Sequence, residues 1–143
     1  MKILIFVIIS AVIYFGIAIA LIFFVKLKQA IARLYADTKY HPGKEVSGRA
    51  VRKGYGRSLE CLIKNQDRAG KKIKKWHGPY LDSDLKDPFG NKYGAYLRKS
   101  PRGNEYVVIY SLGLDKSPSR DDTETIYSMN RLKQDAKNEK KKR

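Results

Sequence analysis

The fold is decided by the first 38 residues, which read ILIFVIISAVIYFGIAIALIFFV at 3–25 and KLKQAIARLYADT at 26–38. The first stretch carries no charge and consists mostly of Ile, Val, Phe, Ala and Leu. A helix of this length, rising about 1.5 Å per residue, would extend about 34 Å, enough to cross the roughly 30 Å hydrocarbon core of a bilayer. We predict a single transmembrane anchor here, retained because the apolar run continues beyond the small residues at 18–20.

The second stretch has the pattern of an amphipathic helix. Apolar side chains recur every three or four positions, at Leu27, Ala30, Ile31, Leu34 and Tyr35. Neither Gly nor Pro separates this pattern from the apolar run. We therefore expect one long helix that ends near the strong helix-breaking sequence His41-Pro42-Gly43.

Two β-rich runs lie further along the chain, at Tyr93–Leu97 and Tyr106–Tyr110. The sequence SPRGN at 100–104 separates them and contains both Pro and Gly. Two such runs joined by a turn of this kind are typical of an antiparallel β-hairpin.

The other segments complete the predicted organisation. We expect one short helix capped by Ser58, with apolar residues facing inward, and a second short helix over 125–137. The predicted fold class is α+β: a transmembrane helix that continues into an amphipathic helix packed on a small antiparallel sheet. The chain divides into an anchor (1–25), an α+β domain (26–130) and a basic tail (131–143).

The chain is strongly basic, with 30 Lys and Arg against 14 Asp and Glu in 143 residues, a formal net charge of +16. This surplus predicts attraction to anionic lipid, nucleic acid or an acidic partner. The run KKIKKW at 71–76 could hold a phosphate backbone and stack a base on its indole. We interpret Trp76 as a core residue and the lysines as a solvated face, so nucleic acid is not the expected partner. The alternative function is a membrane-tethered basic module that binds nucleic acid or anionic lipid.

Catalytic chemistry is not predicted. The only cysteine, Cys61, and the two histidines, His41 and His77, do not make a convincing nucleophile–base pair or a structural zinc site. Phosphate-binding and dinucleotide-binding motifs are absent from the sequence. We expect a structural protein without catalytic residues.

Three blocks of sequence carry a family resemblance: WHGPYL at 76–81, DPFGNKY at 87–93 and YSLGLD at 110–115. In this order they resemble the blocks W-x-G-P-Y-L, D-P-W-G-N-x-Y and Y-S-L-G-A-D-G of the type II secretion major pseudopilins, the G subunit family. Upstream, YHP at 40–42 and LECL at 59–62 are similar to shorter pieces of the same family.

The resemblance implies a pilin-like fold and a structural role in protein secretion. It implies association with other pseudopilin-like or secretion-system subunits in a homo- or hetero-oligomer, and a location in the inner (cytoplasmic) membrane with the soluble domain outside the cytoplasm. The positive charges that follow the apolar run, at Lys26, Lys28 and Arg33, favour the opposite topology, but we prefer the topology of the family. The start of the chain, MKILIF, lacks the family's cleavage site and acidic fifth residue, so we do not expect processing by a prepilin peptidase.

A cluster of acidic residues follows the third block, at Asp115, Asp121, Asp122 and Glu124. Calcium takes six to eight oxygen ligands from carboxylates and carbonyls in irregular loops. In the resembling family this loop binds calcium, and the carried-over ligands are the Leu112 carbonyl and the carboxylates of Asp115, Asp122 and Glu124. Alternatively, Asp121 or Asp122 caps the following helix and Glu124 completes a capping box. The sequence leaves both interpretations open.

Overall fold

The computed structural model describes residues 2–44, 59–67, 69–82, 86, 90, 92–111 and 123–143. Residues 16, 17, 19, 20, 123 and 124 are described by their backbone only. The elements in chain order are α1 (Lys2–Thr38), the 3₁₀ turn η2 (Glu60–Leu62), β1 (Gly94–Lys99), β2 (Glu105–Ser111), β3 (Thr123–Ser128) and α2 (Met129–Lys141). The predicted α+β class is confirmed.

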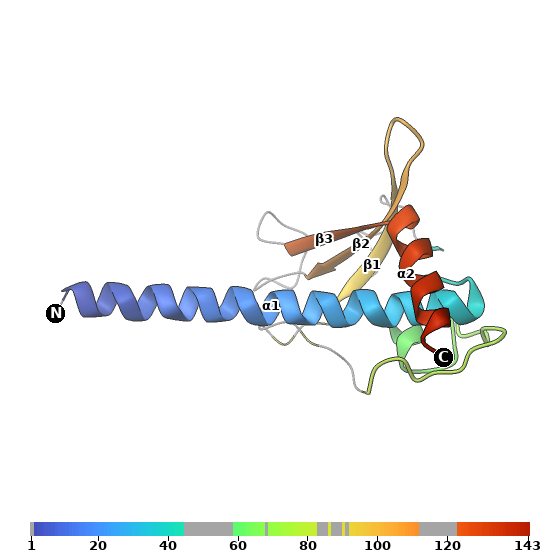
Figure 1. The fold of residues 1–143 in the computed structure, drawn as a ribbon, viewed down its shortest axis with the longest axis horizontal. Helices are drawn as coiled ribbons and strands as arrows, with labels where there is room; N and C mark the ends of the chain where they lie inside the picture. The colour runs from blue at the N-terminus through green and yellow to red at the C-terminus, as the bar shows by residue number, and fades with distance from the viewer. Residues whose placement is uncertain are drawn as a thin grey trace.

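Helix α1 is continuous through the boundary between the apolar run and the amphipathic segment. It ends at Thr38, whose hydroxyl donates a hydrogen bond of 2.7 Å to the carbonyl of Leu34 and accepts one of 3.0 Å from the amide of Tyr40. Lys39 then adopts a φ of 60°, which cannot continue a right-handed helix. Figure 1 shows that the described sheet and α2 lie beside the C-terminal half of α1, whereas the N-terminal end projects beyond them.

The three strands form an antiparallel sheet in the order β1-β2-β3. Their side chains alternate between two faces, as the period of a strand requires. One face contributes Ala95, Val107, Ile109 and Tyr127 to the main hydrophobic core. The other face forms a small second cluster of Tyr96, Val108 and Tyr110.

The main core lies between this sheet and the amphipathic part of α1. Leu27, Ile31 and Leu34 are fully buried there, as the sequence pattern predicted, and Val107 and Ile109 of β2 belong to the same cluster. The hairpin over β1 and β2 is also confirmed, with Gly94 paired to Tyr110 and Lys99 paired to Glu105. These two predictions place the core correctly.

The C-terminal prediction was wrong in one respect: residues 123–128 form β3, and the helix begins only at Met129. The reason is tertiary pairing, because β3 adds to the free edge of β2 from Tyr106↔Ser128 to Ser111↔Thr123. The capping alternative for the acidic loop is therefore incorrect. Glu124 lies within a strand, and the N-cap of α2 is Ser128, whose hydroxyl accepts a 3.2 Å hydrogen bond from the amide of Arg131.

The helix expected near residue 60 is only the single 3₁₀ turn η2. Its N-cap is Leu59, without a side-chain capping bond, and the predicted cap Ser58 lies outside the described residues. Leu59 and Leu62 are buried as predicted.

Candidate assembly surface along helix α1

The predicted calcium ligands are mostly outside the described part of the chain. Leu112, Asp115 and Asp122 are among the residues not described, and Glu124 is placed by its backbone only, opposite Tyr110. Among the described residues, no group of three or more His, Cys, Asp or Glu could hold a metal ion. The pairing of Ser111 with Thr123 does bring the two ends of the 112–122 loop together.

The block WHGPYL at 76–81 connects η2 to the end of α1 through hydrogen bonds.

The indole of Trp76 donates a 2.8 Å hydrogen bond to the carbonyl of Cys61, and the amide of Tyr80 donates one of 2.7 Å to the carbonyl of Leu62. The Tyr80 hydroxyl donates a 2.8 Å bond to Asp37 at the end of α1. Position 78, between Trp76 and Tyr80, favours glycine because a Cβ there would lie 2.5 Å from the Trp76 ring. Trp76 therefore packs against the core, as interpreted from the sequence.

The N-terminal part of α1 presents large apolar side chains to the surroundings. Ile3 is 81% exposed and Val25, at the other end of the apolar run, is 64% exposed. Within the part of the chain that the structure describes, no helix is both long enough and apolar enough to cross a bilayer. The structure thus does not confirm the predicted transmembrane anchor.

The amphipathic part of α1 packs against a second element, the helix α2. Leu132 and Ala136 of α2 are buried, and so are Ala32 and Ala36 of α1, which lie one turn apart on a different side of α1 from Leu34. Small side chains let two helices approach closely. Sequence analysis missed this helix pair, although Met129, Leu132 and Ala136 follow the spacing of three and four that indicates a buried helix face.

Charge pairs join the two helices at their margins. The Nε of Arg33 lies 3.1 Å from Glu139, and Arg143 lies 2.7 Å from Asp37. Burial raises the pKa of Glu139, but the hydrogen bonds and charges of Lys142 and Arg33 outweigh this effect and lower the pKa below its usual value. Glu139 is therefore held as a carboxylate between two cations.

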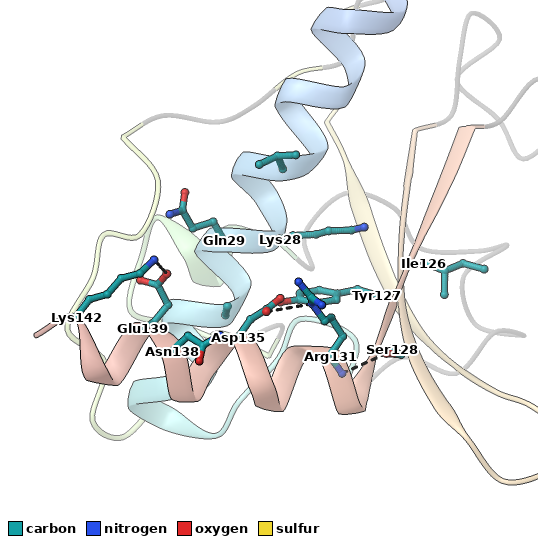
Figure 2. A pocket seen from close by; sticks show the side chains of 12 residues that line it. Lys28, Gln29, Ile126, Tyr127, Ser128, Arg131, Asp135, Asn138, Glu139 and Lys142 are labelled. Carbon is teal, nitrogen blue, oxygen red and sulfur yellow. Dashed lines mark hydrogen bonds and ion pairs between the residues drawn. The ribbon is translucent and has the colours of Figure 1, made fainter.

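A groove of about 540 Å³ opens between α1, α2 and the end of β3. Lys28 and Gln29 of α1 line it together with Arg131, Asp135 and other polar side chains of α2 (Figure 2). The Nζ of Lys28 lies 5.7 Å from the centre of the Tyr127 ring, and the Tyr127 hydroxyl donates a 2.7 Å bond to Asp135. Burial of the Tyr127 side chain and, to a smaller extent, its hydrogen bond to Asp135 raise the pKa of Tyr127. Val25 and Ile126 are the exposed apolar members of the lining.

The outward face of α2 carries lysines and neutral amides but no unpaired carboxylate. Both of its carboxylates are paired, Asp135 with Arg131 at 3.1 Å and Glu139 with Lys142 at 3.1 Å. The lysines on the solvent side form no ion pair with the described residues; they are Lys133, Lys137, Lys140 and Lys141. This face therefore offers positive charge without competing negative charge.

Comparison with known proteins gives one result. A family model described as type II secretion system (T2SS), protein G, matches residues 25–129. No curated protein and no solved structure gives a significant match. The matched segment begins at the end of the apolar run, covers the amphipathic part of α1 and the whole sheet, and stops at the first residue of α2. Because this match spans well over half of the sequence, the chain belongs to the type II secretion system protein G family.

Proposed function

We propose that this chain is a membrane-anchored structural subunit that assembles with other subunits of a type II secretion apparatus and performs no catalysis. The observation that carries the proposal is the division of α1. Its second half is built into the domain of a structural family, and its first half carries large apolar side chains that no described element covers. Apolar surface of that extent is unfavourable in water and is normally buried in lipid or against a partner.

The acyl region of the inner membrane is the proposed environment of this first half. The run from residue 3 to residue 25 is uncharged, and the helix satisfies its own backbone hydrogen bonds, as a segment in lipid must. This assignment uses the sequence of the whole run, including residues 16, 17, 19 and 20, which the structure describes by their backbone only. Family membership supports a soluble domain on the extracytoplasmic side and neighbours that are copies of this chain or other secretion subunits.

Membrane fractionation of cells that express the full chain tests the anchor. The chain should stay in the membrane pellet in high salt and at alkaline pH. Val12→Arg should release a large fraction, because an Arg near the centre of a spanning helix costs about 2.5–3.5 kcal/mol. Gln134→Arg, on the exposed side of α2, is the matched control and should change nothing. Release of the unsubstituted chain by salt alone would show that charge, and not the apolar run, holds it at the membrane.

Topology has a separate test. A reporter fused after Arg143 should be active only if it functions outside the cytoplasm. Activity of a reporter that works only in the cytoplasm would contradict the proposed orientation and leave the anchor standing.

We also propose that the 112–122 loop and Glu124 bind calcium. The support is chemical: the Leu112 carbonyl and the carboxylates of Asp115, Asp122 and Glu124 are hard oxygen donors, and strand pairing holds the two ends of the loop together. When bound, the ion would supply positive charge that keeps these carboxylates close. These residues would otherwise repel one another.

Thermal melting of the full chain in detergent tests this site. Calcium at a hundred times its Kd would add about 2.7 kcal/mol to the stability of the folded state, so millimolar calcium should raise the Tm by several degrees relative to chelator. Asp122→Asn should abolish the difference, and Asp82→Asn, outside the loop, should preserve it. A Tm that does not respond to calcium would contradict the site.

A further inference from the structure

The groove between α1, α2 and β3 carries a surplus of positive charge at a specific place. Its lining includes three cations, Lys28, Arg131 and Lys142, against the carboxylates of Asp135 and Glu139. Arg131 and Lys142 already neutralise these carboxylates at 3.1 Å, and Arg33 adds a further cation to Glu139. The Nζ of Lys28 lies over the Tyr127 ring and makes no ion pair with the described residues. An anion entering the groove would therefore meet no free carboxylate.

The same groove begins where the apolar run of α1 ends. Val25 lines it, and the apolar side chains one turn earlier, Leu21 and Ile22, are exposed. Ile126 of β3, 51% exposed, provides a second apolar wall. Positive charge and apolar surface thus meet within one helical turn.

We propose that this groove binds the headgroup of an anionic phospholipid, with the phosphate near Lys28 and Arg131 and the acyl chains along the apolar half of α1. An amphiphile fits this arrangement because its anion is followed directly by hydrocarbon, whereas an acidic peptide would leave Val25 and Leu21 uncovered. The volume of about 540 Å³ is within the range of small-ligand sites. The inference rests on the proposed membrane anchoring and adds to it a preference among lipids.

Lipid that co-purifies with the full chain provides the test. The chain is reconstituted into vesicles of phosphatidylcholine alone or of an equimolar mixture with phosphatidylglycerol, extracted in a neutral detergent, and its bound lipids are counted by mass spectrometry. From the mixture, we expect enrichment of phosphatidylglycerol over its share in the vesicle. The double variant Lys28→Gln/Arg131→Gln should lose this enrichment, by about fivefold for each cation removed.

The matched control is Lys137→Gln/Lys141→Gln, which removes the same charge from the outward face of α2 and should keep the enrichment. Lys28→Gln alone should lose about fivefold. Because Lys28 does not take part in the Arg131–Asp135 pair, this variant leaves that pair intact. Lys28→Arg should restore the preference.

Four results would overturn the proposal. Equal loss in the groove and control variants would show that overall charge, and not the groove, selects the lipid. Equal binding of both lipids by the unsubstituted chain would refute the headgroup site while leaving the anchor intact. Failure of the chain to associate with either vesicle would refute the anchor and the groove site together. A change in oligomeric state of the groove variant without a change in bound lipid would reassign the groove to a contact between copies.

Discussion

The amphipathic part of α1 is packed on two sides, and the two contacts differ in how much charge accompanies the apolar burial. Towards the sheet, fully buried Leu27, Ile31 and Leu34 meet an apolar face of β2. Towards α2, Leu132 and Ala136 are also buried, and ion pairs whose cations are about half exposed lie at the margins. Burial of apolar surface is not weakened by charge screening, whereas exposed ion pairs are.

The family match sharpens this comparison. It includes the sheet contact and stops at the first residue of α2. The sheet contact therefore lies within the part of the chain that matches the family, and α2 lies beyond it. We expect the first to determine whether the domain folds and the second to determine how α2 is placed.

The largest effect should come from the sheet side. Leu34→Ala removes a fully buried side chain from the core and should lower the free energy of unfolding by about 2–5 kcal/mol. Thermal melting followed by circular dichroism measures the loss, with Gln134→Ala on the exposed side of α2 as the control, expected within about 0.5 kcal/mol. A loss similar to that of the control would mean that the sheet contact is not the dominant one.

The second-largest effect is expected from acid, which should lower the stability of the sheet side of the domain. Burial, and then the charge of Lys44, lower the pKa of His41 to about 4, against an ordinary value near 6.5. At pH values between these two pKa values, His41 is protonated in the unfolded chain but not in the folded chain. The free energy of unfolding should therefore fall by about 2 kcal/mol when the pH is lowered from 7 to 5. Glu139 has a lowered pKa and stays charged in this window, so the α2 side should not contribute.

His41→Phe separates this contribution from the rest of the chain. In this variant, the Tm should change much less between pH 7 and pH 5, while unfolding at lower pH should persist. Thermal melting in a series of buffers measures both. An unchanged slope would show that His41 is not the group that titrates.

A smaller effect is expected for the Arg33–Glu139 ion pair at the margin of the α2 contact. Glu139→Gln removes the partner of Arg33 and should cost about 1 kcal/mol at low salt. Screening shortens from about 10 Å at 0.1 M to about 3 Å at 1 M salt, so the difference should shrink in high salt. A cost that is independent of salt would indicate that packing, and not charge, holds α2 in place.

The smallest effect should come from Arg143→Ala. The Arg143 side chain is about half exposed, and Asp37 keeps the hydrogen bond from the Tyr80 hydroxyl when it is removed. We expect a loss of about 0.5 kcal/mol or less, measured as a shift in Tm at low salt. A loss as large as that of Glu139→Gln would place this pair among the main contacts of α2.

Sequence reasoning located the first contact well and the second poorly. Leu27, Ile31 and Leu34 repeat with helical spacing, and the β1–β2 hairpin is marked by its Pro/Gly turn, so local patterns were sufficient. The stretch TETIYS at 123–128 was predicted as part of a loop and helix because its strand structure depends on a partner, β2, that lies nearby only after folding. The groove could not be predicted, because Lys28 and Arg131 are about a hundred residues apart and only the α1–α2 crossing brings them together.

The continuity of α1 has a mechanical consequence. From residue 17 to Thr38 the helix contains neither Gly nor Pro, the residues at which helices usually kink. This stretch of α1 forms a rod about 33 Å long, with the sheet and α2 packed against its C-terminal part. A tilt of the N-terminal end of this rod should therefore act as a torque on the sheet and α2. In the same way, a pull on the domain should be transmitted along the rod without an intervening kink.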